Sequence, residues 1–280
     1  MHKTILITKA SGEQEPFSEA KLRRSLQRVH TSPTLIDEIV ARVESELADG
    51  IRTSEIYRKA FSLLRKDARP VAARYSLKNA LMELGPTGRP FERFVGELLR
   101  SEGFETQVAQ IVQGVCITHE VDVVGQKGDR HIMVECKFHN RPGLRSDVKI
   151  ALYVQARFED VERQWKKQPQ HGEKFHEVWL VTNTKFTSDA IKYAECVGMN
   201  AVGWSYPLHN GLEVRIDRSG LHPVTCLTSL SGAQKRMLLE KDVILCKELL
   251  NDSGLLQSVG VPKTKVPAVT DEINRLCHLS

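Results

Sequence analysis

Apolar residues in the first 86 positions recur mainly at the spacing of helices. After Ser18, Leu22, Leu26 and Val29 return at i, i+4 and i+7, which places them on one helix face. Ser18 followed by Glu19 is a suitable helix start, because a serine side chain can cap the first free N–H groups. The pattern predicts a strand over 4–8 and helices that begin after Ser18, cover 33–47, begin at Thr53 and cover 71–84.

The pattern changes after a short segment that contains two prolines and two glycines in six residues, 85–90. Beyond it, short β-type runs alternate with helical ones in the order α-β-β-β-α-β-α-β, which predicts a mixed sheet with helices on its faces. The chain is therefore expected to be an α/β (α+β) protein. The predicted helices are 91–102, 146–166 and 188–196, and the strands are 106–112, 117–124, 131–138, 177–181 and 201–204.

The C-terminal part shows a third pattern, a hairpin followed by helices. A hairpin is predicted around Asp217–Gly220, and the pattern is helical again from Ser229. The string LLQSVGVPKTKVPAVTDEI is loosely similar to a helix-hairpin-helix, and a dimerisation or packing domain explains it equally well. The predicted domains are 1–86, helical with a small strand element, 87–206, with the mixed sheet, and 207–280, with the hairpin and helices.

Composition narrows the class of protein. The 280 residues are 41% hydrophobic and 27% charged, with 40 Lys and Arg against 35 Asp and Glu, a net charge of +5. This excess is compatible with a nucleic-acid partner. No apolar run approaches the roughly 18 residues of a membrane span, so we expect no membrane partner. The six cysteines form no CxxC pair and the histidines no HExxH, which argues against a disulfide framework or a zinc site. A reduced cytoplasmic protein is expected.

The string IMVECKF, 132–138, carries the most chemistry. Side chains alternate along a strand, so Glu135 and Lys137 share one face. If the preceding strand pairs with it antiparallel across the turn at Gly128, Asp122 approaches Glu135. Two facing carboxylates repel unless a cation lies between them, and Mg²⁺ prefers such oxygen ligands. Lys137 could then orient or deprotonate the attacking water. The alternative is an ordinary ion pair on a half-exposed sheet.

These segments together resemble the PD-(D/E)xK nuclease superfamily, and most closely its Mrr-like restriction endonuclease branch. The matching pieces are GRPFERFVGELLRSEGF, EVDVV and VECK in the expected order, with VWLVT and TKFTSDAIKYA later. The resemblance implies that Asp122 and Glu135 bind Mg²⁺ and that Lys137 is the catalytic lysine. It also implies a helix-borne acidic residue, for which Glu97 is favoured over its competitors Glu92 and Glu102.

Polar residues after the predicted site are candidates for DNA contact. Arg141 and Arg145 follow Lys137 closely and could hold phosphates, which position DNA without reading its sequence. Many Mrr-like domains carry a glutamine near the catalytic lysine, and Gln155 on the long helix could serve. Each could equally be an exposed, solvated residue.

The stretch ITKASGEQEPFSEAKLRRSL, with the later phrases TSEIY and VAARY, resembles an ATP-cone, a nucleotide-sensing module. The resemblance implies that Lys9, Glu15 and Lys21 bind ATP or dATP as an effector. Lysines near a helix N-terminus suit a triphosphate, because the helix end itself favours anions. The chain has no GxxxxGK[ST] motif, so motor-type ATP hydrolysis is not supported.

We therefore expect a Mg²⁺-dependent DNA endonuclease that ATP or dATP regulates. The alternatives are a nucleotide-responsive DNA-binding regulator that does not cleave, and a structural or assembly protein with both sites idle. A homo-oligomer is compatible with the sequence, but no motif specifies it.

Overall fold

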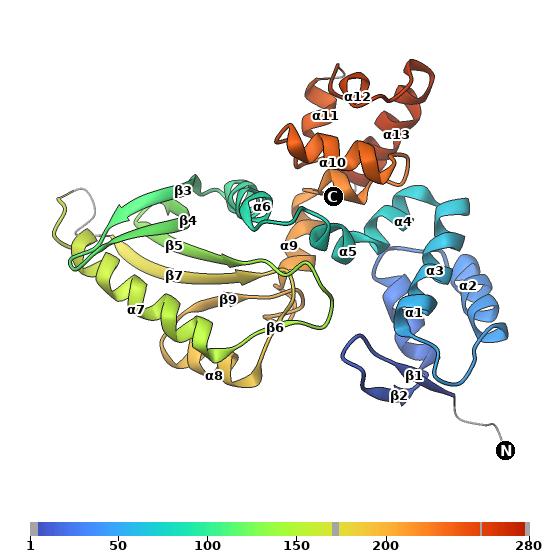
Figure 1. Cartoon of the computed structure of the whole chain (residues 1–280), viewed down its shortest axis with the longest axis horizontal. Helices are drawn as coiled ribbons and strands as arrows, with labels where there is room; N and C mark the ends of the chain where they lie inside the picture. The colour runs from blue at the N-terminus through green and yellow to red at the C-terminus, as the bar shows by residue number, and fades with distance from the viewer. Residues whose placement is uncertain (1–4, 170–173, 253, 278–280) are drawn as a thin grey trace.

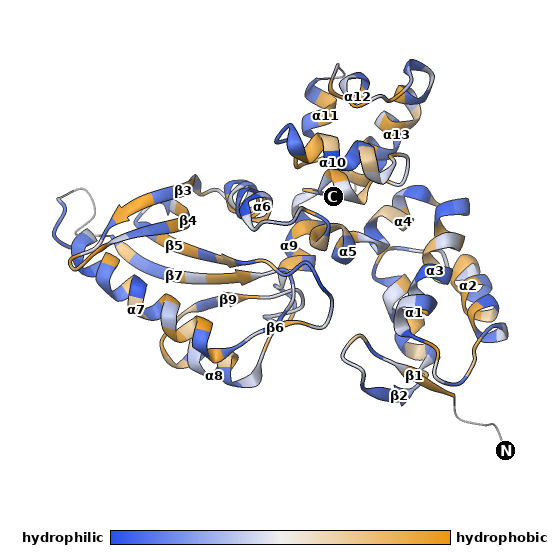
Figure 2. Cartoon of the chain, in the orientation of Figure 1, coloured by the Kyte–Doolittle hydropathy of each residue, from blue (hydrophilic) through white to orange (hydrophobic). Residues whose placement is uncertain are grey.

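The computed structural model describes residues 5–169, 174–252 and 254–277. Figure 1 shows three parts: an N-terminal helical part with a small hairpin, a sheet flanked by helices, and a C-terminal group of helices beside the junction of the other two. None of the described helices is long and apolar enough to cross a membrane. Bands of hydrophobic and hydrophilic residues alternate along the helices (Figure 2), as expected for elements that each bury one face.

The N-terminal part packs its helices around Leu26, Ile39 and Leu64, which are fully buried. The Ser18 hydroxyl accepts a hydrogen bond from the Lys21 N–H at 3.3 Å, so the predicted helix start is confirmed. Its elements are β1 (Leu6–Thr8), β2 (Gln14–Pro16), α1 (Glu19–Gln27), α2 (Pro33–Ser45), α3 (Thr53–Asp67), α4 (Arg69–Tyr75) and α5 (Leu77–Met82).

Two details of this part differ from the pattern-based expectation. The short strand β2 was not predicted, because it is polar and exists only through antiparallel pairing with β1. The helix expected over 71–84 is divided into α4 and α5 at Ser76, whose hydroxyl bonds back to the Ala73 carbonyl at 2.8 Å. Thr4, the first residue of the predicted strand, lies outside the described residues.

The middle part is built on a five-stranded sheet in the order β3-β4-β5-β7-β9. The β3–β4 and β4–β5 pairs are antiparallel, whereas β5–β7 and β7–β9 are parallel, so the predicted mixed sheet is confirmed. The strands are β3 (Glu105–Gln113), β4 (Thr118–Lys127), β5 (Arg130–Lys137), β7 (Phe175–Thr182) and β9 (Asn200–Val202). A separate two-stranded sheet joins β6 (Arg145–Ser146) to β8 (Lys185–Phe186).

Helices cover both faces of this sheet (Figure 1). On one face α6 (Arg89–Ser101) packs Phe94 and Leu98 in the same cluster as Val134. On the other face α7 (Val148–Trp165) and α8 (Ser188–Cys196) pack against Met133 and its neighbours. Residues with odd and even numbers on β5 therefore face different helices.

The hairpin predicted around Asp217–Gly220 is wrong, because this segment is the end of helix α9 (Leu212–Ser219). Gly220 has a φ of 65° and terminates the helix in the left-handed conformation. A glycine after polar residues also marks hairpin turns, which explains the error. Leu212 and Ile216, four residues apart, are fully buried in the cluster that α6 also lines.

The C-terminal helices join the other two parts. The Thr225 hydroxyl donates to the Ala80 carbonyl at 2.7 Å, and the buried Glu272 carboxylate accepts from the Thr228 and Ser229 N–H groups. The elements are η1 (Val224–Cys226), α10 (Gly232–Glu240), α11 (Glu248–Asn251), α12 (Gly254–Ser258), η2 (Lys263–Lys265) and α13 (Val266–Cys277).

Candidate active site

The structure brings Asp122 and Glu135 together on neighbouring strands. The antiparallel β4–β5 ladder ends at the pair Val123–Val134, and Asp122 and Glu135 are the next residues beyond it. There the Asp122 Oδ2 atom accepts a hydrogen bond of 2.6 Å from the Cys136 N–H, which a regular ladder would bond to the backbone. The expected antiparallel pairing is confirmed.

An irregularity in β3 lies beside Asp122. Val108 pairs with Val123 and Gln110 with Val121, but Ala109 between them has a φ of 53° and no paired residue. A left-handed alanine is uncommon and costs roughly 1–2 kcal/mol. Local irregularities in strands re-aim side chains next to functional sites. This one accompanies the end of the β4–β5 ladder at Asp122.

Burial and mutual repulsion make two negative charges unfavourable here. Burial, followed by the nearby Asp122 carboxylate, raises the pKa of Glu135 to about 7. Burial is also the main cause that raises the pKa of Asp122, partly opposed by the hydrogen bond from Cys136. Without a cation, the site is therefore partly protonated near neutral pH.

Arg157 on α7 supplies one positive charge to this site. Its Nη1 lies 2.5 Å from the Glu135 Oε2, and it also donates to the Glu120 carbonyl. The Arg157 guanidinium lies 5.3 Å from the Tyr153 ring centroid, and only 10% of its side chain is exposed. Sequence reasoning missed this residue, because nothing in one sequence connects a helix position to a strand position 22 residues earlier.

Lys137 lies at the exposed end of β5, two residues after Glu135 and on the same side of the strand. Its carbonyl accepts a hydrogen bond of 2.7 Å from the Thr182 hydroxyl of β7, which holds the strand end. Its positive charge lowers the pKa of both Asp122 and Glu135. This effect is smaller than those of burial and of the other neighbours. The lysine is thus within electrostatic reach of both carboxylates.

The acidic residue that α6 presents to this cluster is Glu92. Burial raises the pKa of Glu92 to about 7, and repulsion from Asp122 and then Glu120 adds to it. Glu97 lies elsewhere: it pairs with Arg100, and its Oε2 is 3.8 Å from the Lys247 Nζ. Five helical residues turn through about 500°, so the two carboxylates point roughly 140° apart. The structure does not bring Glu97 to the other predicted residues.

Asp122 and Glu135 are the candidate metal ligands of this site. Among the described residues, no group of three or more His, Cys, Asp or Glu side chains is arranged to hold a metal. The Asp122–Glu135 pair offers carboxylate oxygens from two strands. Mg²⁺ is usually bound by one or two carboxylates together with waters and substrate phosphate. The residues present therefore fit Mg²⁺ and do not fit a closed zinc site.

The predicted DNA contacts lie on two elements near this cluster. Arg141 is exposed in the segment between β5 and β6, and Arg145 is the exposed first residue of β6. The start of this segment is braced by Asn183, which accepts from the His139 N–H at 2.9 Å and donates to its carbonyl at 2.8 Å. Gln155 on α7 donates to Glu159 at 3.1 Å, while its buried Oε1 has no hydrogen-bond partner in the described part of the chain.

The three predicted nucleotide-binding residues converge in the N-terminal part. Glu15 lies between two lysines, 2.9 Å from the Lys9 Nζ and 3.0 Å from the Lys21 Nζ. Hydrogen bonds from Lys9 and then Lys21 lower the pKa of Glu15. A cavity of about 190 Å³ begins beside Glu15 and Lys21. Exposed ion pairs are weak, so a phosphate could displace the Glu15 carboxylate from the lysines.

The turn after Lys9 lies close to the segment that follows Lys137. A Cβ added at Gly143, which has a φ of 89°, would lie 3.6 Å from the Ala10 Cβ. Ala10 belongs to the turn between β1 and β2, and Gly143 lies between Arg141 and Arg145. The turn after Lys9 therefore lies close to the loop that follows Lys137.

Three family models match consecutive parts of the chain. The model of the ATP cone domain matches residues 5–81, and the restriction endonuclease model matches residues 85–202. The model of the AF1548-like C-terminal domain matches residues 222–277. The chain thus combines an ATP cone with a restriction-endonuclease-like domain of the Mrr type, as the sequence resemblances implied.

Similar proteins extend this comparison. An uncharacterized protein of Archaeoglobus fulgidus is 37% identical over 183 residues, which span 65% of this chain and 99% of the relative. The crystal structure of a protein of unknown function, AF1548, has a TM-score of 0.55 and 35% identity, over 69% of this chain and 100% of its own. The structure of the MspJI restriction endonuclease in complex with a 27-mer oligonucleotide is 12% identical, over 80% of this chain and 43% of its own. Its TM-score of 0.28 does not establish a shared fold.

Proposed function

Because the chain belongs to the AF1548-like family and joins an ATP cone to a restriction-endonuclease-like domain, we propose that it is a Mg²⁺-dependent DNA endonuclease regulated by ATP or dATP. The observation that carries the proposal is that Asp122 and Glu135 lie side by side just beyond the end of the β4–β5 ladder, with Lys137 at the next position on the same strand face as Glu135. An ordinary surface ion pair would not require two half-buried carboxylates to face each other.

Asp122 and Glu135 would hold the metal through their carboxylates. When bound, Mg²⁺ polarises a phosphoryl oxygen and offsets negative charge that develops on it. The pKa of Glu135 is about 7, so this residue must lose its proton before it can serve as a ligand. Cation binding is therefore expected to strengthen as the pH rises through 7.

Lys137 and Glu92 would act on the attacking water and the phosphate. The Lys137 ammonium can donate a hydrogen bond to the water or to a phosphate oxygen, which orients the attack and stabilises charge in the transition state. Glu92, with a pKa of about 7, is suited to accept a proton near neutral pH. The phosphodiester bond would then break by in-line displacement of the leaving oxygen.

DNA would be held beside this cluster by Arg141 and Arg145, which are exposed and can each neutralise a phosphate. Gln155 on α7 is the third predicted contact. All three would position the backbone and carry no sequence information directly.

The proximity of Ala10 to Gly143 supports regulation by the nucleotide. A nucleotide on Lys9 and Lys21 would displace Glu15 from both lysines and change the β1–β2 turn, which lies close to the loop that carries Arg141 and Arg145. For regulation, the nucleotide must bind the active and inactive arrangements with different affinities.

A specific observation favours an alternative, a nucleotide-responsive DNA-binding regulator that does not cleave. Arg157 already neutralises Glu135 at 2.5 Å, so the pair could be a structural ion pair across the sheet–helix interface. A gel-shift assay and a plasmid-nicking assay run in parallel, with Mg²⁺ and with or without ATP or dATP, separate the two functions.

Nicking by the wild type that is absent in Glu135→Ala supports the nuclease, and a nucleotide effect on it supports the regulation. A nucleotide-dependent gel shift without nicking would support the regulator instead.

A further inference from the structure

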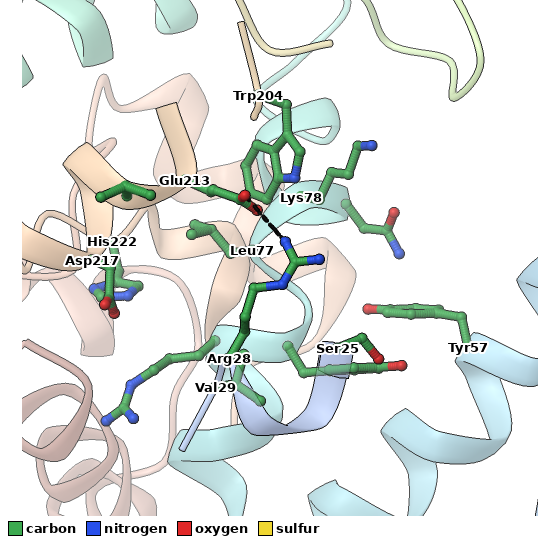
Figure 3. Close-up of a pocket in the computed structure, with 14 residues that line it drawn as sticks. Ser25, Arg28, Val29, Tyr57, Leu77, Lys78, Trp204, Glu213, Asp217 and His222 are labelled. Atoms are coloured by element: carbon green, nitrogen blue, oxygen red, sulfur yellow. Dashed lines mark hydrogen bonds and ion pairs between the residues drawn. The ribbon is translucent and has the colours of Figure 1, made fainter. Parts of the chain in front are cut away.

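A cavity of about 420 Å³ lies between the ATP cone and the sheet-bearing domain (Figure 3). The cone contributes Arg28, Tyr57, Arg74 and Lys78 to its wall, and the other side includes Trp204 and Glu213. Small-molecule sites usually have volumes of about 300–1,000 Å³. The cavity is therefore large enough for a ligand, and it differs from the smaller cavity beside Lys21.

Positive charge in this wall is incompletely neutralised. Only 7% of Arg74 is exposed, and burial lowers its pKa, an effect that the nearby Asp217 carboxylate in the same wall partly opposes. Its guanidinium donates a long hydrogen bond, 3.4 Å, to the Arg275 carbonyl. Lys78 is half-buried near Arg28 and Lys185, and burial lowers its pKa. Three basic side chains, Arg28, Arg74 and Lys78, face two carboxylates, Glu213 and Asp217, in this wall. The excess of positive charge favours an anion, because buried charges are normally paired.

The same wall offers flat rings and hydrogen-bond acceptors. The Lys78 Nζ lies 5.8 Å from the Trp204 ring centroid, and the Tyr57 and Tyr75 rings are stacked with centroids 5.2 Å apart. Figure 3 shows Trp204, Lys78 and Tyr57 around the space that Arg28 enters. The Glu213 carboxylate, also in the wall, can accept hydrogen bonds from hydroxyl or amino groups.

Only one ion pair crosses the cavity wall between the domains: within the described residues that line it, Arg28 Nη1 lies 3.1 Å from Glu213 Oε1. The side chain of Arg28 is 58% exposed, and such pairs are weak. A phosphate group could replace the carboxylate on Arg28 at little cost. The pair therefore does not close the cavity to an anionic ligand.

We propose that this interdomain cavity is a second ligand site, separate from the Lys9–Lys21 site, and that it binds a mononucleotide. The base would lie against Trp204, and the phosphates would contact Lys78 and Arg28. Ribose hydroxyls would donate to Glu213. Each chemical part of a nucleotide thus has a matching group in the wall, and a ligand there would hold the cone against α9.

This site goes beyond the proposed function, because it depends neither on cleavage nor on the Lys9–Lys21 site. The two cavities share Ser25, Tyr57 and Tyr75 in their walls. Occupancy of one can therefore change the affinity of the other through side chains that both contact.

Calorimetric titration of the full chain with ATP tests the proposal. We expect the wild type to bind two ATP per chain. Lys78→Ala should bind one ATP, at the Lys9–Lys21 site, and Lys21→Ala should bind one ATP, in the interdomain cavity. Each substitution is expected to weaken its own site at least about tenfold, since it removes a hydrogen bond to a charged group. Arg28→Ala replaces Lys78→Ala if that variant does not fold. Lys66→Ala, on the exposed face of α3, is the control and should still bind two ATP.

Tryptophan fluorescence gives an independent readout, because Trp204 lines the cavity. ATP should change the emission of Lys21→Ala, and this change should be absent in Lys21→Ala combined with Trp204→Phe. Inorganic phosphate in place of ATP should bind more weakly, because it lacks the ring.

The remaining outcomes are also decisive. One ATP per chain that Lys21→Ala abolishes and Lys78→Ala leaves intact would overturn the second site. One ATP weakened by both substitutions would also overturn it, by indicating a single continuous site. One ATP lost only in Lys78→Ala would support this site and contradict the Lys9–Lys21 site. No ATP binding would contradict both.

Discussion

Glu135 and Arg157 form an ion pair between strand β5 and helix α7, with the Glu135 Oε2 and Arg157 Nη1 2.5 Å apart. Glu135 also faces Asp122 across the end of the β4–β5 ladder. Burial and the like charge of Asp122 raise the pKa of Glu135, whereas the Arg157 guanidinium lowers it. The protonation of Glu135 depends on this balance, and so does its ability to bind a cation.

Removal of Arg157 should shift this balance. In Arg157→Gln the attraction that lowers the pKa of Glu135 is lost, so the pKa rises further above 7. The pH profile of plasmid nicking should then move to higher pH, whereas Arg157→Lys should partly restore the wild-type profile. An unchanged pH profile in Arg157→Gln would show that the pair does not control Glu135.

The stability of the metal-free protein should depend on Glu135 in a defined pH range. Its folded-state pKa of about 7 lies above the ordinary 4.5, so its contribution is fully present below 4.5 and is lost as the pH rises through 7. Relative to Glu135→Gln, the wild type should lose up to about 3 kcal/mol of unfolding free energy over this range.

Urea unfolding of both proteins in EDTA at several pH values measures this difference. A constant difference in unfolding free energy between the wild type and Glu135→Gln would mean that the folded-state pKa is not raised. Mg²⁺ added at high pH should recover stability in the wild type and not in the variant, because only the wild type has both carboxylates.

Lys137→Ala should reduce the nicking rate by about 10²-fold or more, the range expected when a group that acts in the transition state is removed. Lys149→Ala is the matched control, because Lys149 is exposed in the first turn of α7. Single-turnover nicking at saturating Mg²⁺ compares the two. A Lys137→Ala rate close to that of the control would exclude a catalytic role for this lysine.

The two glutamates of α6 should differ in importance. Glu92 is repelled by Asp122 and Glu135, whereas Glu97 pairs with Arg100. Glu92→Gln should therefore reduce nicking more than Glu97→Gln does, as measured by initial rates on the same plasmid. A larger loss in Glu97→Gln would restore the original assignment of Glu97.

The proximity of Ala10 to Gly143 predicts how the nucleotide signal reaches the site. Ala10 lies close to Gly143, so the large charged side chain in Ala10→Arg is expected to change how the two segments approach each other. The effect of ATP on nicking should then decrease while ATP still binds. Ser11→Arg, at the neighbouring exposed position, is the control. An ATP effect of wild-type size in Ala10→Arg would exclude this route.

Local patterns were sufficient for the part of the site that lies on two adjacent strands. Alternation along IMVECKF placed Glu135 and Lys137 on one face, and the turn at Gly128 specified antiparallel pairing that brings Asp122 to Glu135. Both are short-range properties, which a single sequence records directly.

The other features depend on tertiary packing. Glu92 and Glu97 are both polar positions of one amphipathic helix, and only the sheet against which α6 packs distinguishes them. Arg157 meets Glu135 because α7 covers that face of the sheet. At Gly220 the local residues suit a hairpin or a helix end equally, and the burial of Leu212 and Ile216 decides for the helix.

The most direct test of the account is the nicking of supercoiled plasmid in Mg²⁺ by the wild type and Glu135→Gln. Glu105→Gln is the control, because Glu105 is an exposed residue of the same domain. We predict nicking by the wild type and the control in Mg²⁺, no nicking by Glu135→Gln, and no nicking by any of the three proteins in EDTA. Nicking by Glu135→Gln at the wild-type rate would contradict the assignment of Asp122 and Glu135 as the centre of a nuclease.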